Sequence, residues 1–156
     1  MTQLKETIAE YSFKAEVPKS IEDFYEAIKK EHTFVRNQYD IEKQCLDMQL
    51  MSREVCRVFF LDGQNRILGS MDFFGSTDHC TIYPRDIFYQ AMVRDATTIA
   101  MAHNHPGGSS QASQADWDLT HRIGRIGKEL DIKLIDHVIM YGDGIQSMRA
   151  LSRWVD

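Results

Sequence analysis

The sequence has 156 residues, of which 43% are hydrophobic, and its formal net charge is −5 at neutral pH. This length and composition are typical of one compact domain with a hydrophobic core. The negative charge excludes whole-chain attraction to nucleic-acid phosphates, so it gives no support to DNA association. The absence of a long apolar run and of an apolar leader predicts a cytoplasmic protein that does not enter a membrane.

The first third of the chain lacks glycine, since the first glycine is Gly63. Apolar side chains follow Ser20 at helical spacing, which predicts an amphipathic helix over residues 20–31. Residues 38–52 fit either a helix or a strand. We therefore expect residues 1–50 to form an N-terminal helical extension and residues 51–156 to form the main domain.

The next segments alternate between strand and helix patterns. The runs VCRVFFLD and RILGSMDFF flank a Gly63-Gln64-Asn65 turn and predict a β-hairpin that starts at Val55. Pro84 is suited to a first helical turn, and the apolar spacing after it predicts a helix over residues 84–95.

The last third of the chain continues this alternation. Residues 97–102 form a short apolar run that predicts a buried strand ending at two histidines, and residues 114–130 have helical spacing. Gly124 and Gly127 weaken that helix, which indicates a close approach to a neighbouring element. Strands are predicted over residues 132–141 and 145–151. The sum is an α/β sandwich with a mixed, mostly antiparallel sheet flanked by helices.

The three cysteines occur at spacings that fit neither a disulfide framework nor a CxxC metal pair. An odd number of thiols without such spacing is typical of an intracellular protein with reduced cysteines. We expect Cys45, Cys56 and Cys80 to be core residues.

Residues 100–117 read AMAHNHPGGSSQASQADW and contain the strongest chemical signal. Side chains alternate along an extended segment, so His103 and His105 point to the same side, and Pro106 favours an extended His105. Asp116 lies in the first turn of the next helix and can supply a third ligand. Two imidazoles and one carboxylate with an open fourth position form a catalytic zinc site.

Simpler interpretations exist for each part of this stretch. Ser113 and Asp116 also match a capping box at the start of a helix, which needs no metal. The two histidines could belong to an ordinary polar turn. The residues alone leave these interpretations open beside the metal site.

The spacing His103-x-His105, seven residues, Ser113, two residues, Asp116 resembles the H-x-H-x7-S-x2-D signature of the JAB/MPN (JAMM) metalloprotease domains. Five runs are similar to the RadC-like branch of that superfamily, over about two thirds of the chain: EVCRVFFLDGQNRILG, YPRDIF, AHNHPGG, SQADWDLTHRI and DHVIM.

This resemblance implies a cytidine deaminase-like α/β sandwich that acts as a zinc-dependent peptidase or isopeptidase. It implies that His103, His105 and Asp116 bind Zn²⁺. It also implies that Glu54 is the general acid/base and that Ser113 donates a hydrogen bond to the oxyanion. Glu42 is a competing acid from the residues alone.

Two features depart from the RadC-like pattern. Gly107 stands where many relatives have serine, and the glycine-free N-terminal region does not resemble their helix-hairpin-helix module. The alternatives are a nucleic-acid-acting protein of DNA repair or mobile elements and a non-catalytic scaffold. Asp136 and His137 could support the site or be a buried strand-end pair. The sequence does not identify the peptide or protein substrate, and it leaves open whether the chain forms a homodimer.

Overall fold

The structure is a computed structural model that describes residue 20 and residues 33–75 and 81–154. The chain forms a compact unit over Phe34–Asp156. The helix predicted over residues 20–31 lies outside the described residues, as does Cys80. The elements of the compact unit are α3 (Gln38–Lys43), the 3₁₀ helix η1 (Leu46–Leu50), β1 (Val55–Leu61), β2 (Ile67–Phe74), α4 (Pro84–Met92), β3 (Thr98–His105), α5 (Gln114–Glu129), β4 (Lys133–Tyr141) and β5 (Gly144–Ser147).

The sheet has five strands in the order β2-β1-β3-β4-β5. Three neighbouring pairs are antiparallel, and only β3 and β4 are parallel. The parallel pair follows from the helix α5 between these strands, because a parallel connection needs a long crossover whereas a hairpin joins antiparallel strands. The predicted α/β fold with a mixed, mostly antiparallel sheet is confirmed.

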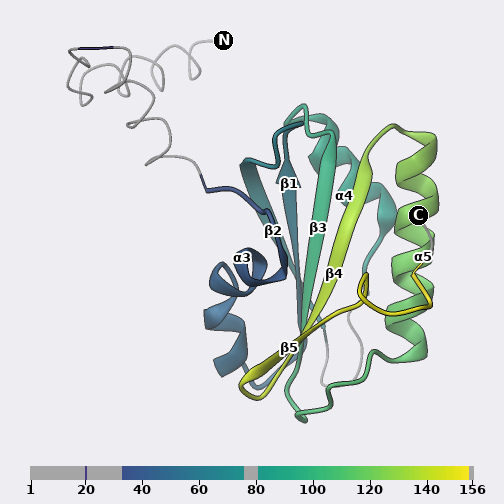
Figure 1. The fold of residues 1–156 in the computed structure, drawn as a ribbon. Helices are drawn as coiled ribbons and strands as arrows, with labels where there is room; N and C mark the ends of the chain where they lie inside the picture. The colour runs from purple at the N-terminus through teal and green to yellow at the C-terminus, as the bar shows by residue number, and fades with distance from the viewer. Residues whose placement is uncertain (1–19, 21–32, 76–80, 155–156) are drawn as a thin grey trace. The chain divides into compact units, whose positions relative to one another are not determined.

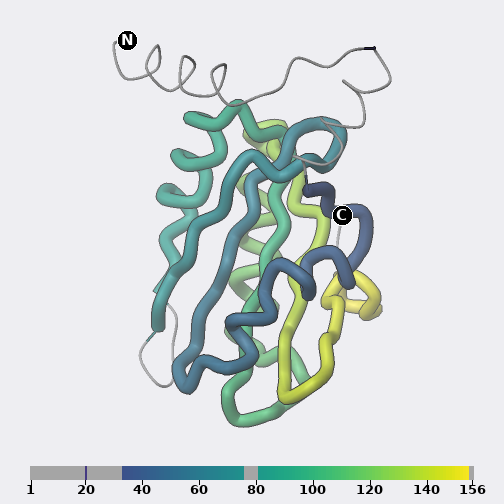
Figure 2. The backbone as a smooth tube through the Cα atoms, turned by 90° about the vertical axis from the view of Figure 1, so that its left-hand side faces the viewer, coloured from purple at the N-terminus to yellow at the C-terminus, as the bar shows by residue number. Residues whose placement is uncertain are grey.

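Helices cover both faces of the sheet. Figure 1 shows α4 and α5 on one face and α3 on the other, and the turned view in Figure 2 shows α3 in front of the strands. Each face has its own hydrophobic cluster, built around Phe60 and Ile123 on the α5 side and around Phe59 and Met48 on the α3 side. The predicted core cysteines Cys45 and Cys56 are buried in these clusters.

Residues 38–52, which the pattern left open, form α3 and η1. Asn37 caps α3 by accepting hydrogen bonds from the backbone N–H groups of Tyr39 and Asp40. Both helices contact β4, so the boundary expected at residue 50 falls inside the compact unit. None of the helices in the described ranges has the length and apolar character needed to cross a bilayer.

Strand β3 is longer than predicted and includes both histidines. It runs between two partners, since His103 pairs with Cys56 of β1 and His105 pairs with Tyr141 of β4. Pairing on both sides extends the strand past the apolar run on which the prediction rested. The last predicted strand is shorter than expected, because β5 ends at Ser147.

The two glycines of α5 differ in their surroundings. A Cβ atom on Gly127 would clash with the carbonyl oxygen of Ile132, so the chain after the helix returns against the helix itself. A Cβ atom on Gly124 would meet nothing within 4 Å. The predicted close approach is confirmed for Gly127 and wrong for Gly124, because propensity alone does not show which side of a helix is covered.

Candidate metal centre

The carboxyl end of the central strand β3 lies close to the first turn of α5, because the loop between them turns back (Figure 1). His103 and His105 come from the last residues of β3, and Asp116 comes from the first turn of α5. One potential ligand atom from each of the three lies within 4.8 Å of the others. The structure therefore brings the predicted trio together, and this group could hold a metal ion.

Asp116 connects the two histidines. Its Oδ1 lies 2.8 Å from Nδ1 of His103, and its Oδ2 lies 3.2 Å from Nε2 of His105. Burial would raise the pKa of Asp116, but the hydrogen bonds with the two imidazoles hold it below its ordinary value. The same carboxylate raises the pKa of His105. Asp116 is thus an anion at neutral pH, as a metal ligand must be.

The predicted capping box is also present. Ser113 is the N-cap of α5, and its Oγ accepts a hydrogen bond from the backbone N–H of Asp116 at 3.1 Å. In return, the backbone N–H and the hydroxyl of Ser113 donate to Asp116 Oδ2 at 2.7 and 2.8 Å. The cap and the metal interpretation are therefore compatible, because the cap orients the carboxylate that faces the histidines.

Glu54 immediately precedes β1 and reaches the trio from the neighbouring strand. Because β1 pairs with β3 so that Cys56 lies opposite His103, the start of β1 lies beside the histidines. Glu54 Oε2 is 3.5 Å from His103 Nε2, and the Glu54 side chain is 21% exposed. The competing Glu42 lies in α3, which packs on the opposite face of the sheet from α5 (Figure 1).

One nitrogen in the cluster indicates that a group fits there. Nε2 of His103 is buried and has no hydrogen-bond partner among the described residues. A buried polar atom without a partner costs about 1–3 kcal/mol. Two imidazoles and a carboxylate, with Glu54 beside them, form the donor set of a catalytic zinc ion. The residues present therefore fit zinc.

The sequence analysis missed Asn104, which lies between the two histidines. Its side chain points to the other face of β3, where it is 3% exposed. Oδ1 of Asn104 accepts from the backbone N–H of Val55 at 2.6 Å, while Nδ2 donates to the carbonyl oxygens of Met48 and Arg53 at 3.0 Å each. These contacts hold the chain on both sides of Glu54. Strand alternation could have found it, because an amide among apolar core positions requires partners.

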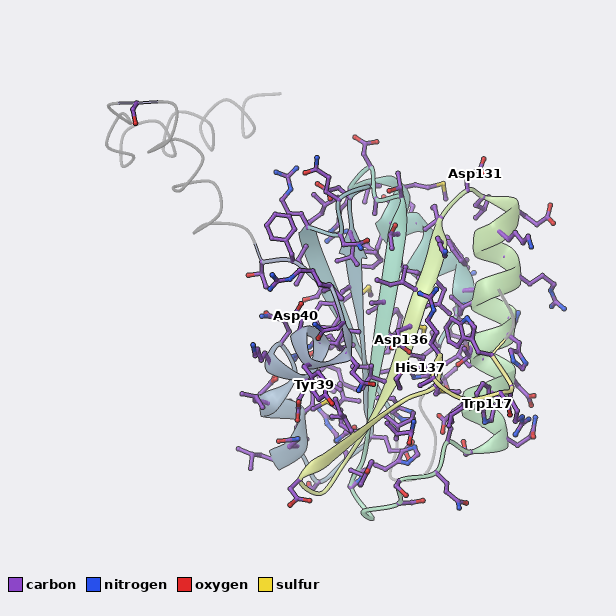
Figure 3. All side chains as sticks on the ribbon, in the orientation of Figure 1. Tyr39, Asp40, Trp117, Asp131, Asp136 and His137 are labelled. Carbon is purple, nitrogen blue, oxygen red and sulfur yellow. The ribbon has the colours of Figure 1, made fainter. Side chains whose placement is uncertain are left out.

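His137 and Asp136 are consecutive on β4 but have different surroundings (Figure 3). The His137 ring is stacked on that of His103, with 6.2 Å between centroids. Its Nδ1 is 2.7 Å from the hydroxyl of Thr120, which donates to the backbone oxygen of Asp116. Burial lowers the pKa of His137 to about 3, so the ring is neutral. His137 therefore packs against His103 and is connected to the backbone of Asp116 through Thr120.

Asp136 does not contact the trio. Its carboxylate accepts hydrogen bonds from the hydroxyl of Ser147 at 2.7 Å and from the backbone N–H of Arg149 at 3.2 Å. These contacts fix the turn after β5, so the Asp136 side chain stabilises the fold and does not support the metal trio.

Comparison with known proteins shows the family of this chain. The profile of the RadC-like JAB domain matches residues 35–153. The chain belongs to the RadC-like JAB domain family. The matched range includes α3 and η1, which the boundary expected at residue 50 had placed outside the domain.

The chain is similar to bacterial proteins named UPF0758 protein. The chain is 38% identical over 104 residues to one from Cupriavidus necator, which covers 66% of this chain and 46% of that protein. It is 33% identical over 113 residues to one from Clostridioides difficile, which covers 71% of this chain and 48% of that protein. The chain therefore spans about half the length of the curated relatives it matches.

Proposed function

We propose that this chain is a zinc-dependent hydrolase that cleaves peptide or isopeptide bonds with water. The observation that carries the proposal is the approach of Glu54 Oε2 to 3.5 Å from the buried Nε2 of His103, which has no hydrogen-bond partner among the described residues. A carboxylate beside a set of zinc ligands is the arrangement needed to accept a proton from water and to deliver it to a leaving group.

In this proposal His103, His105 and Asp116 hold the ion. Zinc, when bound, supplies a Lewis acid that makes water nucleophilic at neutral pH and polarises the substrate carbonyl. Glu54 takes the proton from the water and passes it to the leaving amine.

Ser113 is the proposed hydrogen-bond donor to the oxygen that becomes negative during the reaction. Its hydroxyl donates to Asp116 Oδ2 in the structure, so this role requires the hydroxyl to change its partner. Loss of one such donor typically reduces the rate by about 10²–10³-fold. The cap itself survives the exchange, because the Ser113 backbone N–H also donates to Asp116.

The first test combines metal content with hydrolysis. Elemental analysis of the whole chain should find one zinc ion, and none in a His103→Ala/His105→Ala variant. A mixed peptide library incubated with the zinc-loaded protein should be cleaved. Glu54→Gln should keep its zinc and lose cleavage, whereas the control Glu42→Gln should keep both.

Two results would count against the proposal. The first is a folded protein that binds no zinc although zinc was supplied. The trio would then serve only as a helix cap and a turn, and the non-catalytic scaffold would be favoured. Full cleavage by the zinc-loaded Glu54→Gln variant would show that another group handles the proton.

A further inference from the structure

A hollow of about 430 Å³ lies between α5 and the start of β4. Its lining comes from α5 after Thr120, from the turn at Asp131 that leads into β4 (Figure 3), and from Trp154. None of the three proposed metal ligands lines it, so it is separate from the candidate metal centre. Its volume falls in the range of small-molecule pockets, about 300–1,000 Å³.

The hollow is centred on a position of α5 that has no side chain. Its lining residues on α5 are spaced by three or four positions, so they share one face of the helix, and Gly124 lies at the centre of that face. A Cβ atom on Gly124 would meet nothing within 4 Å, so no neighbouring element requires the glycine. Glycine also weakens a helix interior. A larger residue at this position would enter the hollow, so Gly124 leaves room for a ligand at a cost in helix stability.

The inner part of the hollow is apolar. Ile132 and Leu134 are buried members of the hydrophobic cluster on the α5 side of the sheet, and Trp154 packs against that cluster. The hydroxyl of Thr120 already has hydrogen-bond partners within the protein. An occupant of this part therefore gains by burying apolar surface, and the indole wall suits an aromatic ring.

The charged groups of the lining lie at the rim. Lys128 and Lys133 are exposed, and neither forms an ion pair with a described residue. Asp131 is the only acid among the described residues of the lining, and His121 uses Nε2 to bond to the carbonyl oxygen of Arg153. The two lysines thus make the rim positive, although the whole chain has a net charge of −5. A carboxylate or phosphate at the rim can pair with both ammonium groups, whereas a cation is repelled by them.

We infer that this hollow binds a small organic anion that has a flat, apolar body and a carboxylate or phosphate group. The body lies against Trp154 in the space that Gly124 leaves, and the anionic group lies at the rim beside Lys128 and Lys133. This binding does not depend on the proposed hydrolysis, so either proposal can fail without the other.

Three probes with the same naphthalene body test the charge preference: 1-naphthaleneacetate, 1-naphthyl phosphate and 1-naphthylmethylammonium. Calorimetry on the zinc-loaded full chain measures their affinities. At least one of the two anions should bind about tenfold more tightly than the cation, because it replaces two repulsions with two ion pairs. The tighter anion shows whether the site prefers a carboxylate or a phosphate. Acetate, which lacks the body, should bind at least about tenfold more weakly than 1-naphthaleneacetate.

Substitutions test the space and the charges separately. Gly124→Leu fills the hollow from α5 and should weaken the tighter anion at least about tenfold. Leucine favours a helix more than glycine does, so an unchanged or higher Tm would exclude unfolding as the cause. Lys128→Gln/Lys133→Gln should remove the preference for anions over the cation. Arg125→Gln is the control, because Arg125 is an exposed cation of the same helix that does not line the hollow, and it should keep the preference.

The possible outcomes separate this site from the metal centre. Equal affinity for the naphthyl anions and the cation overturns the inference, as does unchanged anion binding in Gly124→Leu. A folded His103→Ala/His105→Ala variant should keep its anion affinity. Loss of that affinity would place the anionic group on the metal ion and would also overturn the inference. A chain that takes up no zinc but binds the anions overturns the proposed function and supports the site.

Discussion

The backbone N–H of Val55 donates to the side chain of Asn104 across 2.6 Å, and this bond places the start of β1 against β3. Asn104 also holds the carbonyl oxygen of Arg53, so both neighbours of Glu54 are tied to the residue between the two histidines. The position of Glu54, the proposed acid/base, is therefore fixed by Asn104, whose side chain lies on the face of β3 opposite the two histidines.

Asn104→Ala should weaken hydrolysis without removing zinc. We expect a loss of about 2–4 kcal/mol in the free energy of unfolding, because the Val55 N–H and the Met48 carbonyl oxygen each lose a buried hydrogen bond and the Arg53 carbonyl oxygen loses a part-buried one. We expect cleavage to fall part of the way to that of Glu54→Gln, and the double variant to be no worse than Glu54→Gln alone. Additive losses would mean that the two residues act independently.

A readout without catalysis accompanies this prediction. Hydrogen exchange at the Val55 amide should accelerate in Asn104→Ala by more than the global change in stability explains. Ser147→Ala is the control, because Ser147 is another buried polar residue whose hydroxyl donates to Asp136 away from the trio. It should lose stability and keep cleavage.

The two roles of Asp116 can be separated by substitutions. Asp116→Asn keeps an oxygen that can accept from the Ser113 backbone, so α5 should lose little stability, but the lost charge should remove zinc binding. Ser113→Ala removes the cap hydroxyl and should cost about 1 kcal/mol of stability while zinc stays bound. Urea unfolding and elemental analysis of both variants check this. Zinc retained at full stoichiometry by Asp116→Asn would contradict the ligand assignment.

The two glycines of α5 predict opposite effects of one substitution. Gly124→Ala should raise the free energy of unfolding by about 0.5–1 kcal/mol, because alanine favours the helix and the added carbon meets open space. Gly127→Ala should lower it by more than about 2 kcal/mol, because the carbon would clash with the Ile132 carbonyl. Thermal and urea unfolding compare the two. Equal stabilisation by both would show that the chain after α5 does not pack as described.

Stability should depend on pH through His137. The pKa of its buried ring is about 3, below its ordinary value of 6.5, so the unfolded chain takes up a proton near pH 6.5 that the folded chain refuses. The free energy of unfolding should therefore be highest above pH 6.5 and decrease below it by up to about 1.4 kcal/mol per pH unit.

His137→Gln should flatten this part of the curve, whatever its effect at neutral pH. Urea unfolding at pH 5 and pH 7 with a chelator present measures the slope. His121→Gln serves as the control, because His121 is only partly buried and bonds through Nε2 to the Arg153 carbonyl. An unchanged slope in His137→Gln would show that the ring is charged in the folded protein.

Most of the fold could be predicted from periodicity. The helix that begins at Pro84 and the helix after Ser113 follow from local spacing, because each has one apolar face, and the hairpin of β1 and β2 follows from two strand-like runs on either side of a glycine turn. The predictions were less accurate where tertiary contacts outweigh local preference. Residues 38–52 form two short helices that pack on β4, and β3 extends through the histidines because strands pair with it on both sides.

The sequence by itself determined the trio His103, His105 and Asp116, because strand alternation and the spacing to the helix start are local properties. The tertiary structure decided what surrounds it. It brought Glu54 to His103 through the pairing of β1 with β3, gave the side chains of Asp136 and His137 different partners, and placed Asn104 and η1 beside the site. Such contacts join residues far apart in the chain, and they depend on strand order and register, which no local pattern encodes.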